Sequence, residues 1–101
     1  MFKVLIADKL SEEAKKIFID NGLKVKTKTG LKEDELIQEL NDCDALVVRS
    51  ATKATKKVIE KSKKLKVIGR AGIGVDNIDI SSATDYGKVV MNTPFGNSIT
   101  T

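Results

Sequence analysis

Short apolar runs alternate with amphipathic helical patterns along the whole chain, and this alternation limits the possible folds more than any other feature. The apolar runs have the length and composition of strands, and they cover residues 2–8, 23–28, 45–50, 65–70 and 88–92. Segments with helical periodicity separate them, at residues 11–22, 31–43, 55–64 and 79–87. Strands and helices that alternate over short connections form a parallel sheet with helices on both faces. We therefore predict a flavodoxin-like three-layer α/β fold with a five-stranded parallel sheet in the order 2-1-3-4-5.

Two of the strand patterns predict a place in this sheet. Residues 23–28, LKVKTK, alternate between apolar and polar side chains and are rich in lysine, which is typical of an edge strand. Residues 45–48, ALVV, are apolar throughout, so we expect a central strand that is buried on both faces.

The helical segments carry apolar stripes that we expect to face the sheet. These stripes are Ala14, Ile17 and Phe18; Leu36, Ile37 and Leu40; and Val58 with Ile59. Gly22 and Gly87 should end the first and last helices, and Asp79 should cap the start of the last one.

Size and charge limit the class of partner. The chain has 101 residues, enough for one small domain, with 18 Lys and Arg against 14 Asp and Glu. The lysines are spread over several segments without interleaved aromatic residues, which argues against a nucleic-acid surface. The apolar runs are too short to span a membrane. We therefore expect a cytoplasmic domain whose partners include neither nucleic acid nor membrane.

The cysteine content agrees with a reducing compartment. Cys43 is the only cysteine, so an internal disulfide is impossible. We expect this thiol to be half-buried in packing, because a nucleophilic role needs a base and the sequence contains no histidine.

Polar and cationic residues follow the predicted strands at the places where ligands of such folds bind. They are Asp8 at the end of the first strand, Arg49 and Ser50 at the end of the third, Arg70 to Gly74 from the end of the fourth, and Asn92 at the end of the fifth. The carboxyl ends of parallel strands meet at one edge of the sheet, and ligands bind there near the point where the strand order reverses. We therefore expect a ligand site at this edge.

Residues 67–79, VIGRAGIGVDNID, join the fourth strand to a glycine-rich loop. Gly72 and Gly74 have the spacing of the first two glycines of the dinucleotide fingerprint, but Asn77 stands at the third, so no complete dinucleotide site is present. A tight turn would explain one or two glycines. Three glycines (with Gly69) beside an arginine favour a row of main-chain N–H groups that bind a carboxylate.

Arg49 and Arg70 are expected at the same edge as this loop. Two guanidinium groups on one rim favour a doubly anionic ligand, such as a phosphorylated acid. Each arginine could instead form a surface ion pair, with Asp8 or Asp76 as its partner. The combination with the glycine loop leads us to prefer the ligand.

Three motifs around this edge resemble one known family. VRSATK at 48–53, GRAGIGVDNID at 69–79 and VMNTPFGNS at 90–98 together are similar to the NAD-dependent D-2-hydroxyacid dehydrogenases, and the similarity covers essentially the whole chain. It implies that residues 1–97 form a segment of the substrate-binding domain. Residues 98–101 would begin the helix that leads to an NAD-binding Rossmann domain beyond this sequence.

The resemblance also implies roles for individual residues. The main chain of the glycine loop would bind the substrate carboxylate, through Ala71, Gly72 and Gly74. The phosphate end of a small phosphorylated 2-hydroxy acid would face Arg49, Ser50 and Arg70. Ile73 would lie on the nicotinamide side of the cleft, and Asn97 at the hinge between the domains.

The family uses a histidine as its general acid/base, and this sequence has none. We therefore assign no catalytic residue and no metal ligand here, and we expect these residues to be inactive alone. NAD and the main contacts of a homo-oligomer would belong to the part beyond residue 101. One alternative is a stand-alone domain that binds a small anionic 2-hydroxy acid without catalysis. Another is a response-regulator receiver, which has this fold but needs an aspartate where Arg49 stands.

Overall fold

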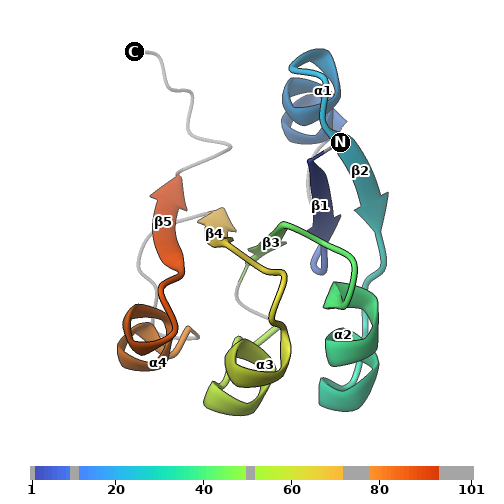
Figure 1. Ribbon diagram of the computed structural model, residues 1–101. Helices are drawn as coiled ribbons and strands as arrows, with labels where there is room; N and C mark the ends of the chain where they lie inside the picture. Colours follow the sequence, from blue (N-terminus) through green and yellow to red (C-terminus); the bar gives the residue numbers. More distant parts are fainter. Residues whose placement is uncertain (1, 10–11, 50–51, 72–77, 94–101) are drawn as a thin grey trace.

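The computed structural model describes residues 2–9, 12–49, 52–71 and 78–93. Within these ranges, strands and helices alternate along the chain (Figure 1). They are β1 (Lys3–Ile6), α1 (Glu12–Asp20), β2 (Lys24–Thr27), α2 (Glu33–Leu40), β3 (Ala45–Val48), α3 (Lys56–Lys61), β4 (Val67–Ala71), α4 (Ile80–Asp85) and β5 (Val89–Thr93). Each element overlaps the segment that its sequence pattern predicts.

The strands form one parallel sheet in the order β2-β1-β3-β4-β5, which confirms the predicted topology. β3 is central, with Leu46 opposite Leu5 of β1 and Ile68 of β4. The lysine-rich β2 lies at one side of the sheet, as its alternating pattern predicts. All the strands run in the same direction, so their carboxyl ends lie together. We call this end of the sheet the carboxyl edge; it comprises residues 7–9, Arg49, Thr52, Arg70 and Ala71.

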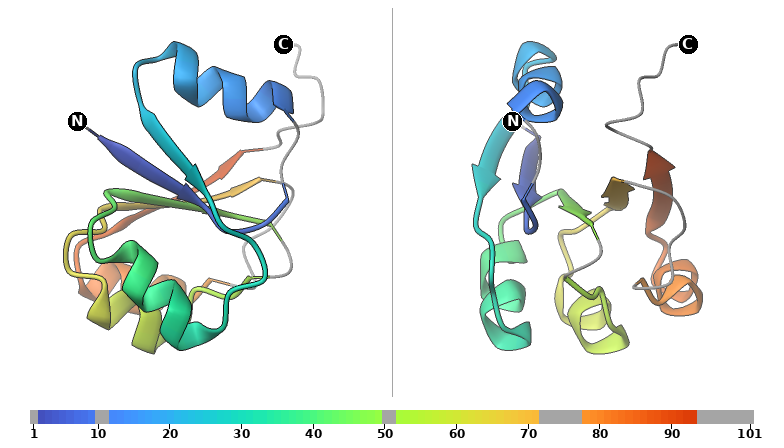
Figure 2. Two further views of the ribbon diagram at one scale, coloured as in Figure 1. Left: turned by 90° about the vertical axis from the view of Figure 1, so that its right-hand side faces the viewer. Right: turned by 180° about the vertical axis from the view of Figure 1, so that it is seen from behind.

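Helices cover both faces of the sheet. Figure 2 shows α1 on one face and α2, α3 and α4 together on the other. This arrangement follows from the apolar stripes, because each helix must bury its stripe against the sheet.

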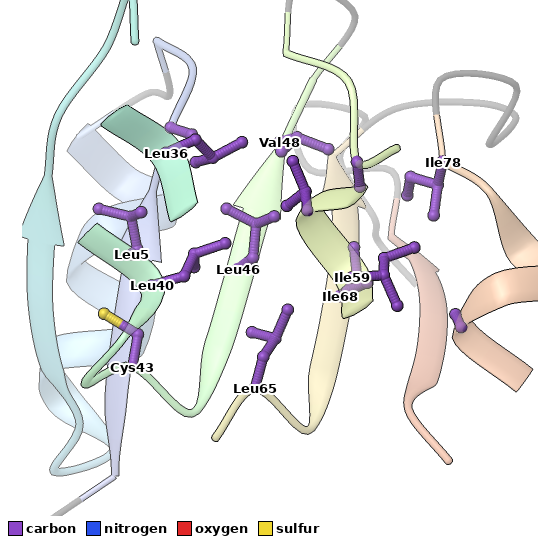
Figure 3. Packing of buried hydrophobic residues seen from close by; sticks show 14 residues of the cluster. Leu5, Leu36, Leu40, Cys43, Leu46, Val48, Ile59, Leu65, Ile68 and Ile78 are labelled. Atoms are coloured by element: carbon purple, nitrogen blue, oxygen red, sulfur yellow. The ribbon is translucent and has the colours of Figure 1, made fainter. Parts of the chain in front are cut away.

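The larger part of the core lies between the sheet and the three helices α2 to α4. Figure 3 shows Leu36 and Leu40 of α2 and Ile59 of α3 against side chains of the strands, among them Leu46 and Ile68. All five of these side chains are at most 2% exposed. Ile37 of the same predicted stripe is only partly buried.

A smaller cluster lies under α1 and consists of Val4, Ile6, Ala45 and Val47, with Phe18 and Leu23 packed against it. Successive residues of β1 and β3 therefore point to opposite faces, and both faces are buried. This explains why the strand patterns are apolar throughout rather than alternating.

Burial on the α1 side is less complete than the helical pattern predicts. Phe18 packs against the small cluster, but Ile17, which we expected on the same buried face, is 50% exposed. The reason is that α1 packs beside β2, at one side of the sheet. On the same face a groove of about 220 Å³ extends from Phe18 to Met91 of β5, and Met91 and Val89 are exposed.

The predicted helix ends are confirmed. Gly22 follows α1 and Gly87 follows α4, with φ of 80° and 72°, a left-handed conformation that favours glycine. At the start of α4, the Asp79 carboxylate accepts a hydrogen bond from the main-chain N–H of Ser82 at 3.0 Å. In the ranges that the structure describes, no helix is long and apolar enough to cross a membrane.

Candidate functional site at the carboxyl edge

The carboxyl edge brings together residues that are far apart in the sequence. β1 leads into Asp8, β3 leads into Arg49, and Arg70 lies near the end of β4 opposite Val48. Because β1, β3 and β4 are neighbours in a parallel sheet, all three residues lie on the same end of it. Asn92, expected at the end of the fifth strand, lies within β5 opposite Arg70, because strand pairing continues one residue further to Thr93.

Asp8 is the buried centre of this edge, with a residue exposure of 5%. Its Oδ2 accepts hydrogen bonds from the main-chain N–H of Arg49 at 2.6 Å and of Thr52 at 3.0 Å. The Thr52 hydroxyl donates to Oδ1 and lies 3.2 Å from the carbonyl oxygen of Ala7. The carboxylate therefore connects the end of β1 to the connection that follows β3.

The two arginines meet at this edge, and they are the only arginines in the sequence. Nη1 of Arg49 donates to the carbonyl oxygen of Lys9 at 3.3 Å. Nε of Arg70 donates to the carbonyl oxygen of Arg49 at 3.4 Å. Arg49 is exposed and Arg70 is half-buried. Two permanent positive charges on one rim can attract an anion with more than one negative charge.

A hollow of about 260 Å³ adjoins the edge. It is lined by Leu31, Glu33, Leu36, Thr52, Lys53 and Thr55. Its wall is fixed by the Thr55 hydroxyl, which donates to the Glu33 carboxylate at 2.7 Å. Thr52 thus contacts Asp8 and also lines this hollow.

The two flanks of the glycine loop are well defined. Ala71 ends β4 and pairs with Thr93, while Ile78 forms a parallel bridge with Ala54. The main-chain N–H of Asp79 donates to the carbonyl oxygen of Ala54 at 2.9 Å. The site assignments for Gly72, Ile73 and Gly74 lie outside the described residues. So do those for Ser50, Asn97 and the linking helix at 98–101.

The described residues around this loop do not fit a dinucleotide. A pyrophosphate of such a ligand binds at the exposed N–H groups of a helix N-terminus. Here α4 begins with the Asp79 carboxylate, which already accepts from Ser82 and is itself negative. Charge repulsion would therefore oppose a pyrophosphate at α4. This agrees with the sequence, in which Asn77 replaces the third glycine of the fingerprint.

Cys43 lies at the opposite, amino-terminal end of β3. It is fully buried rather than half-buried as predicted, because it closes the large core cluster under the end of α2. Its Sγ donates to the carbonyl oxygen of Glu39, and burial raises the pKa of the thiol. A protonated, enclosed thiol is a poor nucleophile, so Cys43 belongs to the packing.

Sequence reasoning missed what Asp8 and Thr52 do. Asp8 was expected at the edge, and an ion pair with an arginine side chain was considered only as the alternative to a ligand. Its carboxylate instead binds main-chain N–H groups. The signal that could have found this is an aspartate directly after a buried strand, since a carboxylate at that depth requires donors. Thr52 gave no such signal.

The fold and the cationic edge identify the class of protein: the chain is a doubly wound α/β domain, and ligands of such domains bind at the carboxyl ends of the strands. The family model for "D-isomer specific 2-hydroxyacid dehydrogenase, catalytic domain" matches residues 4–101. The chain therefore belongs to the family of D-isomer-specific 2-hydroxyacid dehydrogenases.

Similar curated proteins are D-3-phosphoglycerate dehydrogenases. The enzyme of Sus scrofa is 56% identical over 97 residues, which cover 96% of this chain, and that of Methanocaldococcus jannaschii is 54% identical over 99 residues, or 98% of the chain. The match covers only 18% and 19% of those proteins. The 101 residues thus correspond to less than one fifth of these relatives.

Solved structures with the same fold include members that are at least 30% identical to this chain. An NAD⁺-bound 3-phosphoglycerate dehydrogenase from Entamoeba histolytica is 34% identical with a TM-score of 0.82, over 92% of this chain and 33% of that one. A Pyrococcus horikoshii protein is 30% identical with a TM-score of 0.85, over 92% of this chain and 28% of that one.

Proposed function

We propose that these 101 residues form the substrate-binding segment of an NAD-dependent oxidoreductase that oxidises D-3-phosphoglycerate, a reaction of serine biosynthesis. The observation that carries the proposal is the meeting of Arg49 and Arg70 at the carboxyl edge, where Arg70 Nε donates to the Arg49 carbonyl at 3.4 Å. The names of the curated relatives support the choice of substrate.

The proposed ligand has two charged groups, a phosphate for the arginines and a carboxylate for the glycine loop. Its phosphate would bind near Arg49, Ser50 and Arg70, because planar guanidinium groups form paired hydrogen bonds with phosphate oxygens. Its carboxylate would bind the main-chain N–H groups of Ala71, Gly72 and Gly74. In this assignment Ile73 faces the nicotinamide and Asn97 lies at the hinge.

The redox and proton-transfer groups would come from the remainder of a full-length protein. NAD supplies the hydride acceptor when bound, and oxidation of a hydroxyl also needs a base for its proton. The 101 residues contain no histidine, and Asp79 disfavours a pyrophosphate at α4. The task of these residues in the proposal is to bind and orient the acid.

The test is an assay of the full-length protein with NAD and 3-phosphoglycerate, followed through NADH formation. We expect NAD-dependent oxidation by the full-length protein. A polypeptide of residues 1–101, assayed at the same concentration, should form no NADH. A full-length protein that binds NAD yet leaves 3-phosphoglycerate unchanged would contradict the proposed substrate, and turnover by residues 1–101 would contradict the assignment of roles.

A second candidate is a binding domain for a small anionic 2-hydroxy acid that performs no catalysis. It is favoured by the combination of a cationic edge with the absence of histidine from the sequence. Calorimetric titration of the full-length protein with 3-phosphoglycerate separates the two. Binding without turnover, in the presence of NAD, would favour the non-catalytic domain.

A further inference from the structure

The Asp8 carboxylate is buried at the carboxyl edge, and no role in the proposed reaction requires it there. A carboxylate that is only 5% exposed must accept strong hydrogen bonds to offset its lost hydration. It accepts from the main-chain N–H of Arg49 at 2.6 Å, from that of Thr52 at 3.0 Å, and from the Thr52 hydroxyl. All of these donors belong to the connection after β3.

Arg49 is held from three sides through this connection. The Asp8 carboxylate accepts from the main-chain N–H of Arg49, and the Lys9 carbonyl oxygen accepts from the Arg49 guanidinium. The Arg49 carbonyl oxygen accepts from Nε of Arg70. A displacement of the Arg49 main chain would therefore move the Arg49 guanidinium directly. It would also weaken the hydrogen bond from Arg70 Nε to the Arg49 carbonyl. The Asp8 carboxylate thus contributes to the placement of both cations.

We propose that Asp8 is a positioning residue for recognition of the substrate phosphate. It acts through the main chain of Arg49 and through Thr52, without touching the substrate. This inference rests on the function proposed above. By charge alone a carboxylate beside two arginines would weaken the binding of a phosphate. The benefit of Asp8 must therefore lie in the geometry that its hydrogen bonds impose.

Replacement of Asp8 by asparagine separates geometry from charge. The amide oxygen of Asp8→Asn can accept from the main-chain N–H groups of Arg49 and Thr52, as Oδ2 does now. Its amide nitrogen can donate to the Thr52 hydroxyl, which can turn to donate to the Ala7 carbonyl 3.2 Å away. Asp8→Ala leaves all of these donors without the carboxylate. Asn thus keeps the bonds and removes the charge, whereas Ala removes both.

The experiment measures KM and kcat of the full-length wild type and both variants for 3-phosphoglycerate and for glycerate, the same acid without phosphate. For Asp8→Ala we expect KM for 3-phosphoglycerate to rise about 10-fold or more, with KM for glycerate and kcat within about 3-fold. For Asp8→Asn we expect KM for 3-phosphoglycerate within about 3-fold of wild type. Thr52→Val, which replaces the hydroxyl with a methyl group, should raise KM for 3-phosphoglycerate by a smaller factor than Asp8→Ala. This variant tests the inference if Asp8→Ala does not fold.

Other outcomes overturn the inference in distinguishable ways. Equal losses in Asp8→Ala and Asp8→Asn would mean that the charge matters. A fall in kcat for both acids with unchanged KM would mean a smaller folded fraction and a merely structural role. Wild-type inactivity would instead contradict the proposed function. In that case, calorimetric titration of wild type and Asp8→Ala with inorganic phosphate tests the role of Asp8. We expect Asp8→Ala to bind phosphate more weakly than wild type. Equal affinity of the two proteins, or no binding by either, would overturn the inference.

Discussion

At the scale of single residues, Lys88 shows how a charge can be buried in this fold. Its side chain lies just before β5 and is 9% exposed. The ammonium group donates to the carbonyl oxygens of Ser62 and Leu65, both at 2.8 Å. Ser62 is the C-cap of α3, and its carbonyl oxygen also accepts from the main-chain N–H of Leu65 at 3.1 Å. The cation therefore lies at the negative end of this helix. Burial nevertheless lowers the pKa of Lys88.

This lowered pKa predicts a specific pH dependence of stability. Below it, both the folded and the unfolded chain hold the proton, and the cost of the buried charge is fully present. As the pH rises from there towards the ordinary value of 10.5, the folded state releases the proton first, so the unfolded state binds more protons and stability rises. Relative to Lys88→Met, the wild type should therefore gain stability with pH.

Urea unfolding at about pH 7.5 and about pH 10 measures this difference between wild type and variant. Lys61→Met, which removes the same charge from an exposed position in α3, is the matched control. A wild-type advantage over Lys88→Met that shrinks with rising pH would contradict the prediction.

The residue scale is also where sequence reasoning reaches its limit. The positions of Arg49 and Arg70 at one edge follow from their places at the ends of parallel strands, which the alternation of strand and helix patterns predicts. The bonds of Asp8 to main-chain N–H groups do not follow, because they depend on how the connection after β3 turns. That turn joins residues 41 and 44 positions away from Asp8, and no local pattern encodes it.

At the scale of elements, the patterns predict which strands and helices exist, and tertiary hydrogen bonds determine where they end. β3 was predicted to reach residue 50 but ends at Val48. The reason is that the N–H of Arg49 donates to Asp8 instead of continuing the sheet. β4 extends to Ala71 because β5 offers Thr93 as a partner. The hydrogen-bond partners of Arg49 and Ala71 therefore determine where β3 and β4 end, and the periodicity of these two strands does not predict those partners.

Helix α4 offers a test at this scale. It has six residues and follows the glycine loop, and the Asp79 side chain caps it through Ser82. Asp79→Ala should reduce the free energy of unfolding by about 1 kcal/mol, because an N–H at the helix start loses its acceptor. Asp79→Ser keeps an acceptor and should cost only a few tenths of that amount. Urea unfolding of both variants is the measurement, and equal losses would contradict the assignment of this stability to the capping hydrogen bond.

At the scale of the whole molecule, the sheet is covered unequally. Helices α2, α3 and α4 enclose one face, while on the other face α1 lies to one side (Figure 2). Val89 and Met91 of β5 are exposed. The carboxyl edge does not depend on this inequality. Its residues come from β1, β3 and β4, which the parallel ladder holds in register from Val4 to Arg70. The parallel sheet thus positions Arg49 and Arg70, the described arginines of the proposed site.

The central claim is that the paired arginines at this edge recognise a phosphate. The most direct measurement compares wild type with Arg70→Ala in the full-length protein, using 3-phosphoglycerate and glycerate as substrates. Lys61→Ala, which removes a positive charge from the exposed end of α3, is the control for net charge. A hydrogen bond to a charged group contributes about 1.5–3 kcal/mol, so we expect Arg70→Ala to raise KM for 3-phosphoglycerate by about 10- to 100-fold. KM for glycerate should change by less than about 3-fold, and Lys61→Ala should change neither. Equal increases in KM for both acids would contradict the account.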